Sequence, residues 1–324
     1  MLPTIGQIES SASDVYAVLP PTPQYCWPLL SERLGVEVWL KHESHTPVGA
    51  FKIRGGLVYF ADLASGNGTR EVIAATRGNH GQSVAFAARR YGISSTIVVP
   101  VGNSVEKNAA MRALGARLIE QGDDFQSARE HAVALAEGSG AHMIPSFHPL
   151  LVQGVATYSL ELFRAVQGLD RMYVPIGLGS GICGAIAVRN ALSPNTEIVG
   201  VVSAHARAYA LSFASRRQTE SPASTVLADG VACRVPQPEA LEAIWKYVHH
   251  IVEVTDEEIA DAMRTLYECT HNCAEGAGAA AIAAIARERG QLGNKRVAAV
   301  LSGANVDREV FADVLRRSAR IATS

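Results

Sequence analysis

Residues 41–56 read KHESHTPVGAFKIRGG and place Lys52 between two apolar residues, Phe51 and Ile53. A lysine that acts as a Schiff-base nucleophile must lose its proton, and burial or a neighbouring cation lowers its pKa. The apolar neighbours could supply the burial, and Arg54 the cation. The segment alone leaves the ordinary alternative open, because most lysines are charges on the protein surface.

Around this segment, short β-branched runs alternate with longer alanine-rich stretches. Strands are expected over 36–41, 71–76, 95–100, 117–121, 172–176, 198–202 and 297–301, and helices over 81–90, 106–114, 125–137 and 182–192. Such alternation is typical of an α/β fold with parallel twisted sheets covered by helices on both faces. We predict two lobes, with a large domain of residues 1–49 plus 150–324 and a small domain of residues 50–149.

Composition excludes several classes of protein. The net charge of −2 gives no electrostatic reason to expect nucleic acid or a membrane as partner. No apolar run is long enough for a membrane-spanning helix, and the N-terminus lacks the basic start and apolar run of a secretory signal. The five cysteines are odd in number and mostly scattered, which favours reduced thiols and a cytoplasmic location. Cys269 and Cys273 lack further zinc ligands nearby, and we expect them on one buried helix face.

A second motif, TRGNHGQ, occupies residues 76–82 after the expected strand EVIAAT. Backbone N–H groups at the start of a helix bind anions, and the amide of Asn79 can donate a hydrogen bond to a phenolate oxygen. The alternative is an ordinary glycine turn in which Asn79 caps the helix.

A third motif, RMYVPIGLGSGICG, spans residues 171–184 and predicts a strand, a glycine turn and a helix. Glycines allow the backbone to approach a phosphate closely, and the turn's N–H groups can bind it. The same letters match G-x-G-x-x-G from Gly179 to Gly184, so a dinucleotide-binding oxidoreductase is an alternative. That fingerprint requires an acidic residue after the next strand, but this strand ends before Ser203 and no acid follows until Glu220.

Three shorter segments complete the pattern: LADGV at 227–231, CAEGAG at 273–278 and SGANVD at 302–307. Ser302 follows an expected central strand, where its hydroxyl could bond a pyridine nitrogen. A serine in a glycine turn is the simpler explanation. Glu275 could equally be a carboxylate at a helix N-terminus.

Together these motifs, in this order, resemble fold-type II pyridoxal-phosphate enzymes of the threonine/serine dehydratase family. Serine racemase, hydroxyaspartate dehydratase and phenylserine dehydratase belong to the same group, and the fold is that of the tryptophan synthase β subunit. The resemblance implies pyridoxal 5'-phosphate bound to Lys52, which then acts as general base at Cα. It implies the following cofactor contacts: Phe51 against the ring, Asn79 at the 3-oxygen, Gly177, Leu178, Gly179, Ser180 and Gly181 around the phosphate, Gly230 and Glu275 nearby, and Ser302 at the ring nitrogen. It assigns the substrate carboxylate to Thr76, Arg77, Gly78, Asn79 and His80.

The implied reaction converts a β-hydroxy amino acid to a 2-oxo acid and ammonia. Threonine and serine are the default substrates, and hydroxyaspartate and phenylserine remain alternatives. A racemase of the same fold is a further alternative, but racemases carry a serine proton donor where this chain has Arg77. Arginine stays protonated and is a poor acid/base; Arg77 could instead face solvent or a substrate side chain. Many relatives bind a divalent cation at positions that are Ser203 and Tyr209 here, so no metal is predicted. The resemblance also implies a homodimer.

Overall fold

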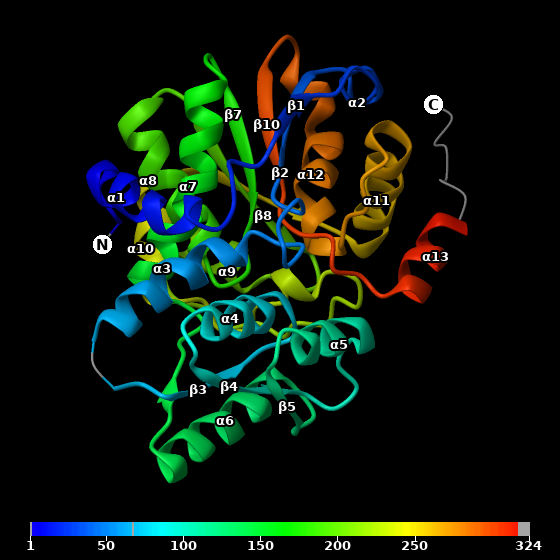
Figure 1. Cartoon of the computed structure of the whole chain (residues 1–324). Coiled ribbons are helices and arrows are strands. Elements are labelled where there is room, and N and C mark those ends of the chain that lie inside the picture. Colours follow the sequence, from blue (N-terminus) through cyan, green and yellow to red (C-terminus); the bar gives the residue numbers. More distant parts are fainter. Residues whose placement is uncertain (1, 67, 317–324) are drawn as a thin grey trace.

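A computed structural model describes residues 2–66 and 68–316, which contain two separate β-sheets (Figure 1). The larger sheet has the strand order β1-β2-β10-β7-β8-β9. Its strands are β1 (Gln24–Cys26), β2 (Glu37–His42), β7 (Arg171–Pro175), β8 (Glu197–Ser203), β9 (Val248–Val254) and β10 (Arg296–Leu301). Strands β1 and β2, which are connected by a helix, are antiparallel, and all other pairs are parallel.

The smaller sheet is parallel throughout, with the order β5-β4-β3-β6. Its strands are β3 (Glu71–Ala75), β4 (Ser94–Val99), β5 (Arg117–Glu120) and β6 (His142–Met143). Strands β3 and β4 are buried along nearly their whole length, because helices cover both faces of the sheet.

Helices cover both faces of the larger sheet, each over its own apolar core. One core includes side chains from α2 (Pro28–Leu34), α11 (Asp256–Thr270), α12 (Gly276–Leu292) and α13 (Arg308–Arg316). The other includes side chains from α1 (Ile5–Tyr16), α7 (Pro149–Ala165), α8 (Ser180–Leu192), α9 (Ala208–Ser215) and α10 (Pro238–Tyr247). A single 3-10 turn, η1 (Asp229–Val231), lies in the connection between α9 and α10.

The smaller sheet is likewise enclosed. Residues of α3 (Lys52–Ser65), α4 (Asn79–Arg90) and α5 (Val105–Ala113) share one core with β3 and β4. Alanines of α6 (Phe125–Ser139) pack on the opposite face. Figure 1 shows α4 and α5 between the two sheets and α6 on the far side of β3–β5. The α/β fold with helix-covered parallel sheets is therefore confirmed; the exact domain boundaries stay a prediction.

The expected elements appear with ends shifted by one or two residues, as in β4, which starts at Ser94. One detail was wrong. Helix α11 ends at Thr270 and His271 adopts a left-handed conformation, so Cys273 lies beyond the helix that carries Cys269. Within residues 2–66 and 68–316, no helix is long and apolar enough to cross a membrane.

Candidate active site

The predicted site residues follow the carboxyl ends of three parallel strands. Residues 76–80 follow β3, residues 177–181 follow β7, and Ser302 follows β10, which lies beside β7 in the larger sheet. In open α/β sheets the carboxyl ends of the strands form the ordinary ligand crevice. The topology thus brings segments more than 200 residues apart to one place.

Lys52 is the first residue of α3, and backbone contacts fix its position. The N–H of Phe51 donates to the carbonyl of Ser302 at 3.0 Å, and Ala50 pairs with Gly303 in an isolated β-bridge. The hydroxyl of Ser83 donates to the carbonyl of Lys52 at 2.7 Å. The lysine is therefore attached to the end of β10 on one side and to α4 on the other.

Gly55, three residues after Lys52, lets α3 pack directly on α7. A Cβ atom at Gly55 would lie 2.8 Å from the carbonyl oxygen of Leu151, and one at Gly154 would collide with the carbonyl of Arg54. Such close approach of two helix backbones is possible only without side chains. The sequence IRGG therefore encodes the docking of the helix that carries Lys52.

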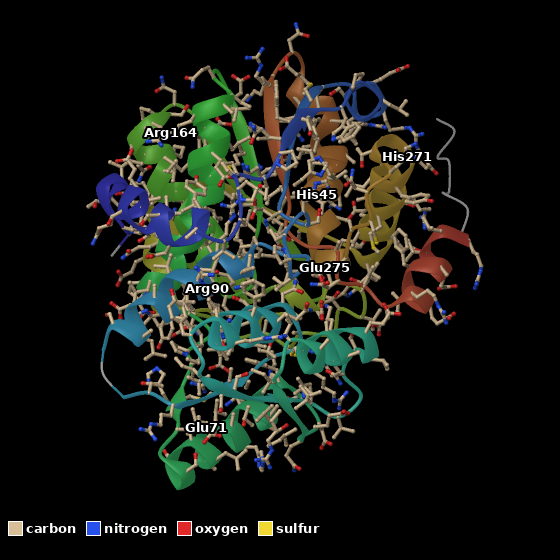
Figure 2. The ribbon with its side chains drawn as sticks, viewed as in Figure 1. His45, Glu71, Arg90, Arg164, His271 and Glu275 are labelled. Atoms are coloured by element: carbon tan, nitrogen blue, oxygen red, sulfur yellow. The ribbon has the colours of Figure 1, made fainter. Side chains whose placement is uncertain are left out.

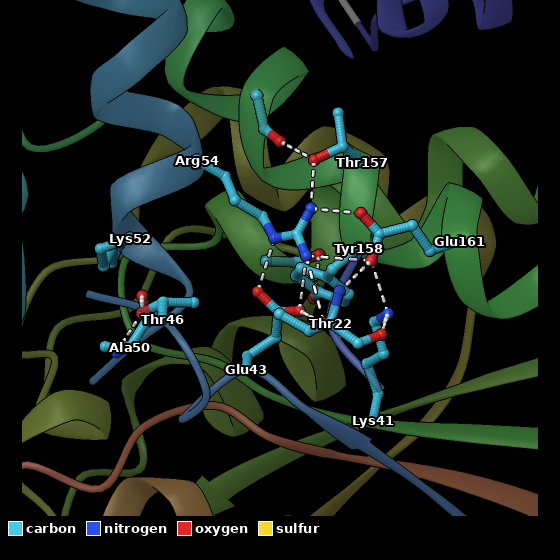
Figure 3. Close-up of polar contacts among 12 residues, drawn as sticks. Thr22, Lys41, Glu43, Thr46, Ala50, Lys52, Arg54, Thr157, Tyr158 and Glu161 are labelled. Atoms are coloured by element: carbon cyan, nitrogen blue, oxygen red, sulfur yellow. Dashed lines mark hydrogen bonds and ion pairs between the residues drawn. The ribbon is translucent and has the colours of Figure 1, made fainter. Parts of the chain in front are cut away.

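Arg54 anchors the same helix through a fully buried ion cluster (Figure 3). Its guanidinium binds both oxygens of Glu43, at 2.7 and 3.0 Å, and both oxygens of Glu161, at 2.6 and 2.9 Å. Lys41 adds a 2.5 Å ion pair to Glu161. Two cations and two carboxylates balance the buried charge. The expectation that Arg54 lowers the pKa of Lys52 was wrong, since its charge is neutralised by Glu43 and Glu161.

The ammonium of Lys52 donates to the hydroxyl of Ser180 at 3.1 Å. Burial, which disfavours the charged form, lowers the pKa of Lys52 to about 8. The predicted nucleophile and the predicted phosphate loop are thus in direct contact, and Lys52 loses its proton more readily than an ordinary lysine.

Residues 177–181 form a tight backbone cup between β7 and α8. Gly179 adopts φ 102°, a left-handed conformation that favours glycine, and α8 begins at Ser180. A Cβ at Gly177 would collide with the carbonyl of Gly230, which brings the expected LADGV loop against the cup. The N–H groups at the start of α8 make the cup suitable for an anion.

Tyr209 supports this cup from behind, a role that sequence reasoning did not predict. Its hydroxyl donates to the carbonyl of Leu178 at 3.0 Å and accepts from the N–H of Gln237 at 3.0 Å. Ser203 is fully buried at the end of β8, where its hydroxyl accepts from the N–H of His205. The part of the chain that the structure describes holds no group of three or more His, Cys, Asp or Glu side chains placed to bind a metal.

The loop before α4 is organised by Thr76. Its hydroxyl oxygen accepts from the N–H of Gly78 at 2.9 Å and of Gly81 at 3.2 Å. Burial, with a contribution from the charge of Lys52, lowers the pKa of His80 to about 3, so His80 is neutral. Its Nε2 is buried without a partner among the described residues. Arg77, in contrast, is exposed and makes no hydrogen bond or ion pair to any described residue.

Asn79 is the first residue of α4, with Gly78 rather than Asn79 as the cap. Its amide donates to Glu275 at 2.6 Å. Glu275 occupies the N-cap position of α12, without a capping hydrogen bond from its side chain, and lies where the two lobes meet (Figure 2). Burial raises the pKa of Glu275. The ammonium of Lys107, 3.2 Å from the Glu275 carboxylate, opposes this rise. Lys107 was missed from the sequence, because nothing in helix α5 distinguishes it from a surface lysine.

Lys107 joins α5 of the smaller sheet to the larger one. Its ammonium also pairs with Asp229 at 2.7 Å. Burial alone would lower the pKa of Lys107, but the carboxylates of Glu275 and Asp229 outweigh it and raise that pKa. A Cβ at Gly78 would collide with the Lys107 side chain, so this glycine is required by the lysine beneath the loop.

The remaining predicted residues line the same region. Ser302 is buried, and its hydroxyl makes one long contact of 3.4 Å to the carbonyl of Ala277, so it can turn to a better acceptor. Phe51 meets Tyr158 edge to face, with ring centroids 6.1 Å apart. The backbone cup beside Lys52 and the unpartnered nitrogen of His80 suit a phosphorylated cofactor that forms an imine and a carboxylate substrate.

A comparison with known families defines the class. Residues 17–303 match the family model described as pyridoxal-phosphate dependent enzyme, so the chain belongs to this family of cofactor-dependent enzymes. This match decides against a dinucleotide-binding oxidoreductase and confirms pyridoxal phosphate as the cofactor.

Particular relatives point to a narrower group. The L-threonine ammonia-lyase of Thermotoga maritima is 36% identical over 280 residues, which are 86% of this chain and 70% of that protein. The processed form of threonine deaminase isoform 2 from Solanum lycopersicum superimposes with a TM-score of 0.88 at 30% identity, covering 96% of this chain and 93% of that one. Maize serine racemase gives a TM-score of 0.89 at 25% identity, covering 97% of each chain. Other curated relatives, named biosynthetic threonine dehydratases, are longer, and the chain spans 58–60% of their length.

Proposed function

We propose that this enzyme is a lyase that eliminates water from a β-hydroxy amino acid, threonine or serine, after which hydrolysis by water releases ammonia and leaves a 2-oxo acid. The observation that carries the proposal is the contact of Lys52 with Ser180, which joins a lysine of lowered pKa to the backbone cup of residues 177–181. Relatives named threonine ammonia-lyase and threonine deaminase support the same reaction.

Pyridoxal phosphate, when bound, supplies an electron sink that makes the Cα proton of an amino acid acidic. The chain would hold it by Lys52, by the N–H groups of residues 177–181, and by Ser302 at the ring nitrogen. Asn79 would donate to the 3-oxygen, Phe51 would lie against the ring, and Gly230 would leave room beside the phosphate. Ser302 is a neutral partner that does not force the ring nitrogen to be charged.

Side chains and backbone groups of the protein move the Cα proton and bind the substrate carboxylate. Lys52, whose pKa is lowered to about 8, can take the Cα proton in its neutral form. The N–H groups of Arg77, Asn79 and His80 and the hydroxyl of Thr76 would bind the substrate carboxylate at the start of α4, in the loop that Gly78 allows. His80 stays neutral and can donate one hydrogen bond there without adding a charge.

Arg77 argues against a racemase. A racemase requires an acid/base group on each face of Cα, and the exposed guanidinium of Arg77 is a poor proton donor or acceptor. Lys52 can therefore exchange a proton on one face of Cα only.

We further propose the domain division of residues 1–49 plus 150–324 and 50–149, a homodimer, and a cytoplasmic location for the enzyme.

The decisive experiment combines colour and product. The purified protein with added pyridoxal phosphate should be yellow, and borohydride reduction should attach the cofactor to Lys52. Ammonia and 2-oxo acid should form from one enantiomer of threonine or serine, with phenylserine and hydroxyaspartate as comparison substrates. Lys52→Ala should abolish turnover. A yellow protein that only interconverts enantiomers, as judged by chiral chromatography, would replace the lyase with a racemase.

A further inference from the structure

A chain of hydrogen bonds connects the turn before Lys52 to Asn79. The amide nitrogen of Asn305 donates to the carbonyl of Val48 at 2.8 Å and to the amide oxygen of Asn79 at 2.8 Å. The amide nitrogen of Asn79 then donates to Glu275 at 2.6 Å. Asn305 lies in the SGANVD segment, where no role had been predicted for it.

The direction of this chain is determined by one backbone group. The carbonyl of Val48 can only accept, so the NH₂ group of Asn305 must face it. The second hydrogen of that NH₂ group points to Asn79, whose facing atom must therefore be its oxygen. The NH₂ group of Asn79 is thereby turned to Glu275, and it retains one hydrogen with no partner among the described residues.

Close packing holds these hydrogen-bonded side chains in place. A Cβ at Gly49 would lie 2.8 Å from the amide oxygen of Asn305. A Cβ at Gly303 would collide with the Glu275 carboxylate and would lie 3.2 Å from the amide nitrogen of Asn79. Rotating the Asn79 amide by 180° would place nitrogen against nitrogen at Asn305 and oxygen against oxygen at Glu275. Each such contact loses a hydrogen bond and leaves a group unsatisfied.

We propose that Asn305 is a positioning residue that sets the orientation of the Asn79 amide and directs its free N–H to the cofactor 3-oxygen. This inference rests on the proposed function, in which Asn79 contacts that oxygen. Asn305 acts through Asn79 and has no contact with the reacting atoms. The chain begins at the turn immediately before Lys52, so the lysine and the 3-oxygen donor share one support.

The test is a double-mutant cycle read by cofactor affinity and by the visible spectrum. Asn305→Asp keeps the shape but removes both donors, so the Asn79 amide should turn over and lose its contact with the cofactor. Loss of a hydrogen bond to a charged oxygen should weaken pyridoxal-phosphate binding about tenfold. The pH midpoint of the visible band should move to higher pH. A hydrogen-bond donor at the 3-oxygen stabilises the state in which that oxygen has lost its share of the proton, so losing the donor makes the proton harder to remove.

Asn79→Ala should change the affinity and the spectrum in the same direction, and adding Asn305→Asp to it should change little more. Asn305→Ala, which adds no charge, repeats the cycle and serves if the aspartate variant does not fold. Asn195→Asp, at an exposed turn, is the matched control and should leave both readouts unchanged.

Equal effects of the Asn305 change with and without Asn79, or a folded Asn305 variant with unaltered affinity and spectrum, would overturn the inference alone. A wild-type protein that binds no pyridoxal phosphate would instead overturn the proposed function.

Discussion

At the scale of single residues, Lys52 combines burial with charge. Burial lowers its pKa to about 8 from the ordinary value of 10.5. Below pH 8 the lysine is protonated in both the folded and the unfolded chain, and the folded cofactor-free protein carries the full cost of a buried charge. Between about pH 8 and 10.5 only the unfolded chain binds the proton, so this cost disappears as pH rises.

We therefore predict that Lys52→Met stabilises the cofactor-free protein by about 3 kcal/mol below pH 8. The gain over wild type should shrink toward zero at pH 10.5, apart from a constant packing difference. Urea unfolding of both proteins from pH 7 to 10.5 measures it. The difference between them is used because buried tyrosines and cysteines titrate in the same range and cancel. A gain that does not depend on pH would contradict the assigned cause.

Arg77 is the residue at which this chain departs from the racemase pattern. Because its side chain is exposed and has no partner among the described residues, Arg77→Ala should change the free energy of unfolding by less than about 0.5 kcal/mol. Turnover of threonine should remain within about threefold of wild type. Steady-state kinetics on several β-hydroxy amino acids check this. A selective loss of activity on hydroxyaspartate or phenylserine would mean that Arg77 contacts the substrate.

At the scale of elements, the phosphate cup depends on the hydroxyl of Tyr209, which bridges Leu178 and Gln237. Tyr209→Phe removes the partner of two partly buried backbone groups, the carbonyl of Leu178 and the N–H of Gln237. We expect a loss of about 2 kcal/mol in the free energy of unfolding and weaker pyridoxal-phosphate binding. Tyr91→Phe, at a half-exposed position, is the control.

A chelator tests whether a bound cation, rather than Tyr209, supports residues 177–181. Because Tyr209 makes these contacts through its own hydroxyl, a chelator should leave the melting temperature of wild type unchanged. A chelator that lowers it, with recovery on addition of magnesium or calcium, would show that a cation also supports the fold.

The strands that sequence alone could predict are those with continuous apolar runs, such as β8 and β10, and those that precede glycine turns, such as β7. Strand β9 (VHHIVEV) was missed because two histidines interrupt its pattern, and β1 has only three residues. Helix α3 was missed because Gly55 and Gly56, the fourth and fifth of its residues, disfavour helices. Gly55 is present because α7 approaches it and Gly56 because Ser83 of α4 does, which only the folded structure shows.

For the site, the residues predicted by motif are those whose own segments supply the chemistry, such as Lys52 and the cup. Lys107, Tyr209 and Asn305 act across the fold, on partners that lie far away in the sequence. Their importance comes from where the two sheets meet, and no local pattern encodes that.

At the scale of the whole molecule, the two lobes are joined beside the site by charge and by helix caps. Asp307, before α13, accepts from Ser104 at 2.5 Å and from the N–H of Glu106 at 3.2 Å. Glu106 in turn accepts from the N–H of Arg308 at 3.0 Å. Each lobe thus caps a helix of the other. Lys107 lies next to these caps and adds ion pairs to the partly exposed Asp229 and to the buried Glu275.

Lys107→Met should remove the counter-ion of a buried carboxylate and destabilise the protein by about 3 kcal/mol at pH 8. Burial already raises the pKa of Glu275, and the loss of Lys107 should raise it further. A carboxyl whose pKa is raised in the folded state loses stability as pH rises through that range, so the defect should shrink as pH falls toward 5. Lys246→Met, at an exposed position, should show no such dependence.

The double variant Lys107→Met/Glu275→Gln tests the electrostatic cause directly. Removing the charge of Glu275 leaves no unpaired buried ion, since Asp229 is partly exposed to solvent. Stability at pH 8 should therefore recover by at least half relative to Lys107→Met, as measured by urea unfolding. If the double variant is as unstable as the single one, the ion pair contributes little, and the instability comes from packing under Gly78 that methionine does not reproduce.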